Sequence, residues 1–424
     1  MYRALTVLLV AWWLLGLAGA AHLASALRPS SDRVVAHVAF LDDAIAQGAG
    51  PRMQELFPEG EFFTVGLTAL AAGNAALASA DPAEKAIATD RLDRAIARLA
   101  EPAAAAHFGD IPELQHGTFY RGWLLLLRVT RAELAGTATP DLQTEADALA
   151  RALVADPTGV PPSYPDQRWP CDAVVAMGAV QRVHALAGQA TPQLADWLAR
   201  LDRLRDPWTG LLPHQIHPDG TPVSGPRGSS QSIIHTFWPQ LSPTAAEDWT
   251  VFRRLFVVGE VGLVGVREHP SGVSGGGDVD SGPLIRGISL SSSAVTLGAA
   301  RANGDLELAR SLDREAEALG LPFEWAGKRR FAGGLMPVGD AFVAWARSIP
   351  AADQAALPPL PTAWGLIALA GLAVAPLGLA PIGYAALRAR RRTRPGPPGD
   401  QGRRTPATRS QPPRASSTST RSAR

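Results

Sequence analysis

Two kinds of helical pattern alternate along the middle of the chain. In residues 91–99, leucine and isoleucine recur every three or four positions with arginine and aspartate between them. This spacing predicts a helix with one face in water. Six segments share the pattern: 32–48, 84–100, 141–155, 192–205, 244–258 and 305–320. We expect these six helices to lie on the outside of the fold.

The second kind of segment carries almost no charge. Six segments share this property: 62–77, 117–129, 169–186, 227–241, 278–300 and 331–346. A helix that is apolar around most of its circumference has to be covered by other helices, so we expect these six to lie inside. An outer helix precedes each inner one, and the pair repeats about every 54 residues, as expected of a ring of helical hairpins.

The connections between these helices differ in length. Short turns such as 79–82 and 242–243 follow the inner helices, whereas longer loops such as 206–226 and 259–277 follow the outer helices. Loops this long in a compact domain are usually functional. In a ring of hairpins the long loops all emerge where the inner helices begin, and we predict the functional site on that face.

The repeat number and the loop asymmetry resemble the (α/α)6-toroid superfamily. This superfamily includes glycoside hydrolases, polysaccharide lyases, sugar epimerases and enzymes of the linalool dehydratase–isomerase type. The resemblance covers about residues 30 to 350 and includes no family-specific motif. It implies an all-α (α/α)6 toroid of twelve helices over residues 28–357, with substrate bound in a funnel at the amino ends of the inner helices. An open α-solenoid of helix pairs would show a similar period and is the alternative.

Apolar segments lie at both ends of this region. Residues 4–21 are uncharged behind Arg3, and small residues follow at 24–26, so residues 1–27 are predicted to be a signal peptide or an N-terminal membrane anchor. Residues 357–387 are uncharged, and this stretch is longer than the about 20 residues that cross a bilayer. It predicts a transmembrane helix over residues 358–387.

Arginines at 388, 390, 391, 392 and 394 follow this predicted helix. Positive charge beside a span marks the cytoplasmic side. We therefore expect the protein in the cell membrane, with its main domain extracytoplasmic. Residues 388–424 are predicted to form a basic, disordered cytoplasmic tail, because they have almost no apolar side chains.

Composition narrows the classes of partner and cofactor. The net charge of +1 gives no reason to expect nucleic-acid binding. A single cysteine, Cys171, excludes an intrachain disulfide and multi-cysteine zinc or iron–sulfur sites. His214 and His217 could bind a metal with Asp219, but no firm third ligand accompanies them. We predict no metal and no cofactor.

The sharpest catalytic candidates are aspartates near the starts of inner segments. Asp278 and Asp280 follow three glycines and are one residue apart, so mutual repulsion could keep a proton on one of them. That carboxyl would act as general acid, while Asp172 serves as base or nucleophile. Asp340 or Glu268 could take the role of Asp172. A turn residue and a helix cap would explain Asp278 and Asp280 equally well.

Other polar and aromatic residues at these starts are candidates for substrate binding. They are His116, Tyr120, Trp169, Cys171, Arg227, Ser229, Ser230, Trp238 and Glu268. The turn at 227–230 could hold a carboxylate or phosphate at a helix start, and the tryptophan rings could support a sugar. The Cys171 thiol is either acidified by the helix dipole or a small buried residue. Helix capping alone would also explain many of these residues.

Together these features predict an acid–base enzyme. Its reaction would be that of a hydrolase or lyase on a cell-envelope glycan or a related polyhydroxylated ligand. One alternative is a lyase or isomerase of a small apolar alcohol, which would need Cys171 and a mainly hydrophobic funnel. Another is a non-catalytic envelope scaffold that binds a glycan or a protein.

Overall fold

The computed structural model describes residues 33–112, 114–260 and 263–352, with scattered residues between 7 and 22 and between 383 and 389. By their contacts the residues form two units, of which Leu17–Leu372 contains the helical domain considered below. The predicted segments 1–27, 358–387 and 388–424 lie mostly outside the described residues. None of the helices within the described residues has the length and apolar character needed to cross a membrane.

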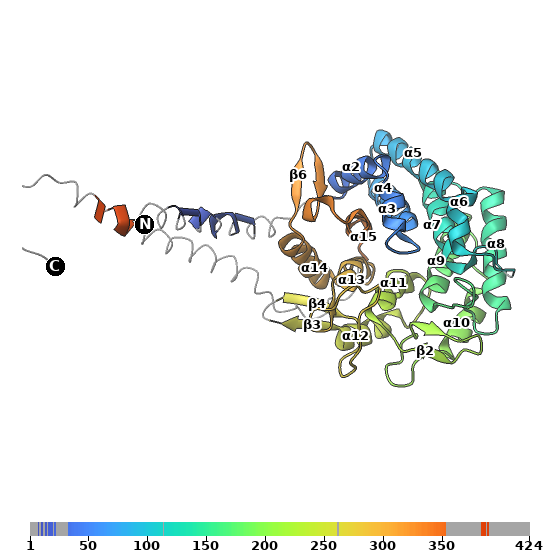
Figure 1. Cartoon of the computed structure of the whole chain (residues 1–424). Coiled ribbons are helices and arrows are strands. Elements are labelled where there is room, and N and C mark those ends of the chain that lie inside the picture. Colours follow the sequence, from blue (N-terminus) through green and yellow to red (C-terminus); the bar gives the residue numbers. More distant parts are fainter. Residues whose placement is uncertain are drawn as a thin grey trace, which may run out of the picture. The chain divides into compact units, whose positions relative to one another are not determined.

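The domain is mainly helical, as the sequence predicts, and its buried helices pack in a closed cycle. Each of the six contacts the next, and the last contacts the first (Figure 1). They are α4 (Gly60–Leu77), α7 (Gly117–Ala135), α9 (Pro170–Leu186), α11 (Gly228–Phe237), α13 (Leu290–Ala302) and α15 (Pro337–Ser348). We call this cycle the inner ring.

The amphipathic helices surround the inner ring. They are α2 (Arg33–Ala46), α5 (Pro82–Leu99), α8 (Pro140–Ala155), α10 (Leu194–Asp202), α12 (Ala245–Phe256) and α14 (Leu306–Leu319). In α5, for example, Leu92 and Leu99 are buried while the charged positions face outward. The side chain of Asp81 accepts a hydrogen bond from the amide of Ala83, and this capping together with Pro82 explains where α5 begins.

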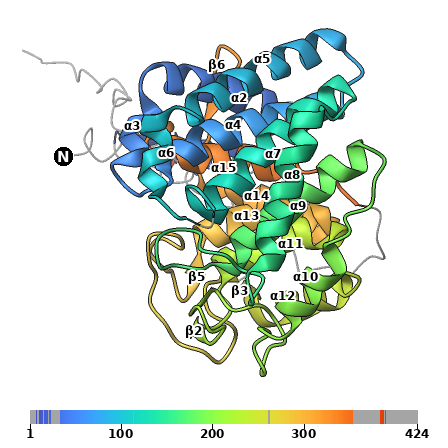
Figure 2. The same ribbon diagram turned by 90° about the vertical axis from the view of Figure 1, so that its right-hand side faces the viewer.

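Short elements fill the long connections between an outer helix and the next inner one. The helical ones are α3 (Ala49–Gln54), α6 (Pro102–Ala105), η1 (Ala106–Phe108) and η3 (Ala332–Gly334), while η2 (Trp238–Gln240) follows α11 directly. Three small antiparallel sheets are β1 (Gln215–Ile216) with β2 (Pro222–Ser224), β3 (Val257–Glu260) with β4 (Leu263–Arg267) and β5 (Ile288–Ser289), and β6 (Phe323–Trp325) with β7 (Lys328–Arg330). Figure 2 shows α3, α6, β2 and β5 toward one side of the ring.

Two predicted helix starts are wrong. The fifth inner helix begins at Leu290 and not at Asp278, because Ser289 caps it through the amide of Ser292 and the preceding chain pairs as β5 with β4. Asp278 and Asp280 therefore lie in a loop. The sixth inner helix begins at Pro337 and not at residue 331, since glycines with positive φ at 333 and 334 interrupt the helical path.

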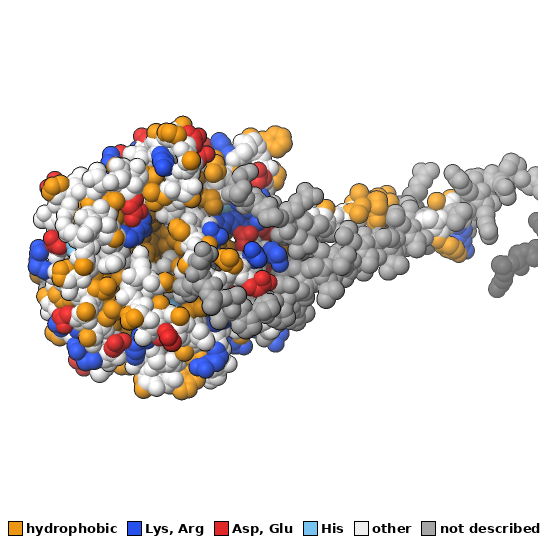
Figure 3. Space-filling view, turned by 180° about the vertical axis from the view of Figure 1, so that it is seen from behind, with side chains coloured by type: hydrophobic (Ala, Val, Ile, Leu, Met, Phe, Trp, Pro, Cys, Tyr) orange, Lys and Arg blue, Asp and Glu red, His pale blue; other side chains and the backbone are white. Residues whose placement is uncertain are grey.

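Aromatic side chains from alternate inner helices meet in the middle of the ring. Trp123 of α7, Phe237 of α11 and Trp345 of α15 are each at most 4% exposed. Their ring centroids are 5.6 Å apart for the two tryptophans, 6.2 Å for Trp123 and Phe237, and 6.3 Å for Phe237 and Trp345. We call these three residues the aromatic plug. Seen from behind, the ring has a central hollow with hydrophobic side chains along it (Figure 3).

We expect W345A to destabilise the domain by about 3–5 kcal/mol, because truncating a buried tryptophan leaves a cavity that the neighbouring helices fill only in part. The free energy of unfolding in denaturant measures this. The matched control is W325A, at a tryptophan that is 72% exposed, for which we expect a change within about 0.5 kcal/mol. Equal effects of the two substitutions would contradict the role of the plug.

Candidate functional site

Three acidic side chains lie at or before the starts of inner helices and influence one another electrostatically. Glu59 immediately precedes α4, Asp172 is in the first turn of α9, and Asp280 is in the loop before α13. The charges of Glu59 and Asp280 both raise the pKa of Asp172. We call these three residues the acid cluster. Two of them, Asp172 and Asp280, are predicted catalytic residues.

Asp172 is the most deeply buried member, at 6% exposure. Burial is the largest cause that raises its pKa to about 7, and the nearby carboxylates add to it. A hydrogen bond with Ser163 and a weaker one from Cys171 Sγ, at 3.8 Å from Asp172 Oδ1, act in the opposite direction. At neutral pH this carboxyl is close to half protonated, which is the state that a general acid or base needs.

Glu59 is held by a tyrosine. The hydroxyl of Tyr164 donates a hydrogen bond to Glu59 Oε1. Burial, followed by the charges of Asp172 and Glu59, raises the pKa of Tyr164 well above its usual value, so the phenol stays a donor. The Tyr164 ring also contacts Trp169, with centroids 5.3 Å apart, and stacks on Phe119 at 5.7 Å. Aromatic surface therefore borders the acid cluster.

The two loop aspartates have different environments. The side chain of Asp280 is exposed, but the surrounding protein removes much of its hydration. This loss of hydration is the largest cause that raises the pKa of Asp280 to about 7, and the charge of Asp278 is the next. Burial alone would raise the pKa of Asp278, but hydrogen bonds from Ser281 and the charge of Arg227 lower it below its ordinary value. Arg227 Nη1 lies 2.5 Å from Asp278 Oδ2. Asp278 is therefore the ionised member and Asp280 the one that can keep a proton.

Glu268 is fully buried and fully paired. Its carboxylate accepts hydrogen bonds from Arg227 Nε at 2.8 Å, from the amide and hydroxyl of Ser229 at 3.1 and 2.7 Å, and from the hydroxyl of Ser292 at 2.8 Å. Helix amino ends stabilise an anion, and this carboxylate lies at the starts of both α11 and α13. The anion held by the 227–230 turn is thus the chain's own.

Tyr120 and Trp238 point away from the acid cluster. The Tyr120 hydroxyl donates to the carbonyl of Leu99 within the core. Trp238 lies in η2, which follows the carboxyl end of α11, and its indole donates to Asp248. Their amphipathic side chains satisfy buried polar groups. Trp238 lies away from the face where the inner helices begin, whereas Tyr120 is in the first turn of α7 and its hydroxyl is turned into the core.

His116 and Cys171 lie at helix starts. His116 precedes α7 with a φ of 67°, and its Nδ1 is 3.0 Å from the carbonyl of Gly109. Cys171 is buried, and burial followed by the charge of Asp172 raises its thiol pKa well above the usual value. The thiol is therefore neutral, which is the second of its two sequence interpretations.

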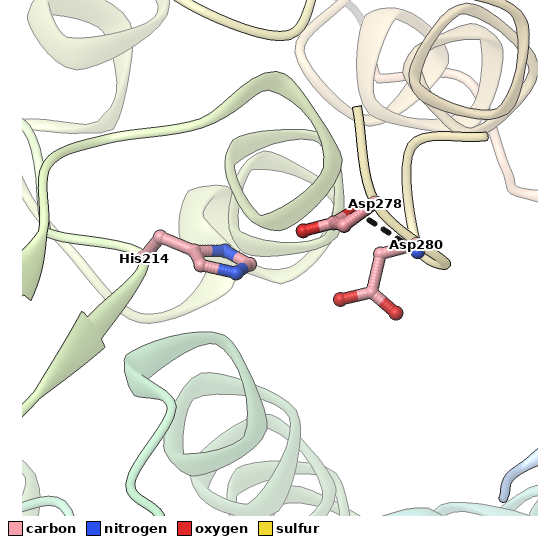
Figure 4. A group of neighbouring side chains, drawn as sticks. All are labelled: His214, Asp278 and Asp280. Atoms are coloured by element: carbon pink, nitrogen blue, oxygen red, sulfur yellow. Dashed lines mark hydrogen bonds between the residues drawn. The ribbon is translucent and has the colours of Figure 1, made fainter. Parts of the chain in front are cut away.

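His214 lies next to the two loop aspartates. Its ring is directed toward Asp278 and Asp280 (Figure 4), and one ligand atom from each of the three lies within 4.8 Å of the others. Its Nδ1 is 3.1 Å from Ser230 Oγ. Burial and the charge of Arg227 lower the His214 pKa to about 4, so the ring is neutral. Among the residues that the structure describes, these three form a group that could hold a metal ion. His217 and Asp219, its partners in the sequence interpretation, are exposed on the β1–β2 turn.

Sequence reasoning missed Glu59 and did not place Tyr164 or His214 at the acid cluster. Glu59 directly precedes an inner helix. An acidic residue near the start of an inner segment is the signal that pointed to Asp172, and the same signal could have identified Glu59. Tyr164 was visible only as one of several aromatic loop residues. The position of His214 depends on the pairing of β1 with β2 and on its contact with Ser230 at the start of α11.

The chain matches no protein-family model and no curated protein. The fold and the geometry of the acid cluster are therefore the basis on which its function is inferred.

We expect E59Q to lower the pKa of Asp172, because it removes a negative charge that disfavours the Asp172 carboxylate. S163A should raise the same pKa, since it removes a hydrogen bond that stabilises the carboxylate. Carbon-13 NMR titration of labelled aspartate, with the Asp172 signal assigned from its loss in D172N, measures both. Shifts in the same direction would contradict the described environment.

Asp172 should also give stability a distinct pH dependence. Its pKa is about 7 in the folded state against an ordinary 3.8, so the folded chain binds the proton more tightly than the unfolded chain does. Asp172 therefore lowers the free energy of unfolding progressively as pH rises from about 4 to 7. D172N removes that penalty. We expect it to be about 2–4 kcal/mol more stable than wild type near pH 8, with the difference shrinking toward pH 4. Thermal and urea unfolding across this range test it; a wild-type advantage at pH 8 would contradict it.

Proposed function

We propose that the domain is an (α/α)6 toroid enzyme that performs acid–base chemistry, as a hydrolase or lyase, on a glycan or a related polyhydroxylated ligand. The observation that carries the proposal is the environment of Asp172. A buried carboxyl with a pKa of about 7, at the start of an inner helix and beside further carboxyls, can hold and release a proton at neutral pH.

The acid cluster supplies two complementary roles. In hydrolysis, Asp172 gives its proton to the leaving oxygen, and the Asp280 carboxylate accepts a proton from the attacking water. In a lyase reaction, Asp280 takes a proton from carbon and Asp172 protonates the oxygen that leaves. Burial keeps the pKa of Asp172 high enough for it to reload with a proton, and the charge of Glu59, which Tyr164 holds in place, adds to this effect.

The surroundings of the cluster support the ligand class. Trp169 and Tyr164 present aromatic surface next to carboxyls, and sugars combine apolar faces with hydroxyl groups in the same way. The uncharged segments 4–21 and 357–387 support the remaining part of the proposal, which is a domain tethered to the cell membrane on its extracytoplasmic side, with the tail in the cytoplasm.

A second candidate function has its own observation. Cys171 carries a neutral thiol 3.8 Å from Asp172 Oδ1, and Phe108 and Phe119 stack on each other near Tyr164. This apolar surface favours a lyase or isomerase of a small apolar alcohol, in which Asp172 protonates the hydroxyl that leaves as water and the Asp280 carboxylate accepts the proton from the adjacent carbon. A binding scaffold without turnover is the remaining alternative.

The test is turnover by the purified full-length chain on a panel of neutral and uronate polysaccharides and on small terpene alcohols. New reducing ends report hydrolysis, ultraviolet absorbance of unsaturated sugars reports elimination, and gas chromatography reports dehydration. We expect D172N to lower kcat/KM by about 100-fold to 10,000-fold, the range for loss of a general acid.

The matched control is D90N on the outer helix α5, where the exposed carboxylate pairs with Arg94 of the same helix, and its rates should equal those of wild type. C171A separates the two reactions, because glycan cleavage should survive it and alcohol dehydration should not. Wild-type turnover that persists in D172N, or glycan binding without any turnover, would refute the acid–base proposal.

A further inference from the structure

His214, Asp278 and Asp280 form an arrangement that one ion can fill. One ring nitrogen and two carboxylate oxygens lie within 4.8 Å of one another and face a common space (Figure 4). Ligand atoms that each stand about 2.0–2.4 Å from a shared ion are separated by no more than twice that distance, about 4–4.8 Å. The three side chains can therefore reach one ion with small adjustments.

The hydrogen bonds of His214 set its tautomer. The hydroxyl of Ser230 donates its only hydrogen to the carbonyl of Arg227, at 3.2 Å. Its contact with His214 Nδ1, at 3.1 Å, is therefore one in which Nδ1–H donates to the serine oxygen. Nε2 keeps its lone pair. A neutral imidazole with one N–H fixed by a hydrogen bond is the usual form of a histidine metal ligand.

The charges around this space favour a cation. Asp278, Asp280 and Glu268 supply three carboxyl groups, and Arg227 supplies one positive charge against them. Among the described residues, no hydrogen-bond donor reaches the side chain of Asp280. A histidine lone pair and an unpaired carboxylate that face each other repel unless a proton or a cation lies between them.

We infer that His214 Nε2, Asp278 and Asp280 bind a divalent metal ion of the class that combines imidazole and carboxylate ligands, such as Zn²⁺ or Mn²⁺. Arg227 and Ser230 orient two of the ligands from behind. Three protein ligands leave positions for water or for ligand hydroxyl groups. The inference rests on the proposed function and changes it at one residue: with the ion bound, Asp280 is a metal ligand, and a water on the ion would take over the part of the nucleophile that Asp280 activates in the metal-free scheme. Asp172 remains the proton carrier.

The experiment is calorimetric titration of the chelator-treated full-length chain, in detergent, with ZnCl₂ and with MnCl₂ alone. We expect one equivalent to bind. H214N keeps a donor for Ser230 but removes Nε2, and it should weaken binding about 10-fold to 100-fold. H217A is the control, because His217 is exposed on the β1–β2 turn, three residues after His214, and its replacement should leave affinity unchanged.

D280N provides a second variant at an exposed position, so a folding defect in H214N does not leave the inference without a test. It should weaken binding to a similar extent. Failure of wild type to bind either ion, or equal affinity in wild type, H214N and D280N, would overturn the inference. D172N should bind the ion normally, so loss of turnover in D172N without metal binding in wild type would uphold the proposed function and reject only the metal site.

Discussion

The contact among Trp123, Phe237 and Trp345 is the interaction on which the rest of the structure depends. These side chains come from α7, α11 and α15, which are alternate members of the inner ring. Each therefore touches the others across the middle of the ring and not along its circumference. Close packing of rigid aromatic rings sets the distance between opposite helices. That distance in turn brings the loops and first turns of the inner helices close enough for Glu59, Asp172 and Asp280 to feel one another's charge.

The hydrogen bonds of a buried carboxyl in this domain decide whether its ionised form is stabilised or destabilised. Glu268 is surrounded by the donors of Arg227, Ser229 and Ser292, so it holds the starts of α11 and α13 as a structural anion. Asp172 is nearly as buried, but within the described part of the chain its side-chain hydrogen bonds are one with Ser163 and a weak one from the Cys171 thiol, and other carboxyls lie nearby. The ionised form of Asp172 is therefore destabilised, and its presence lowers the stability of the folded domain. A group held in this way is typical of functional sites, where side chains are arranged for chemistry and not for the most stable fold.

The acid cluster and the proposed metal site meet at Asp280. Asp172 lies on α9 and His214 in the loop before α11; the exposed side chain of Asp280 influences the charge of Asp172 and has a ligand atom within 4.8 Å of one on His214. Asp172, as proton carrier, and an ion bound at the proposed metal site would therefore both act on a ligand that lies at Asp280. The aromatic surface of Tyr164 and Trp169 borders the Asp172 side, which would leave the more polar part of a ligand for the ion.

The sequence by itself determined the helices, because the period of apolar positions is a local property: the outer pattern around Leu92 and the uncharged inner segments both predict helices that the structure contains. It also pointed to Asp172, since a polar residue at the start of an apolar helix is visible in the chain. Only the tertiary structure decided the rest. Ser289 and the β4–β5 pairing moved the start of α13 past Asp280, packing turned Tyr120 and Trp238 into the core, and contacts between distant segments brought Glu59, Tyr164 and His214 to the site. The direction of a side chain and the pKa of a carboxyl depend on neighbours that are far away in sequence, and no local pattern contains them.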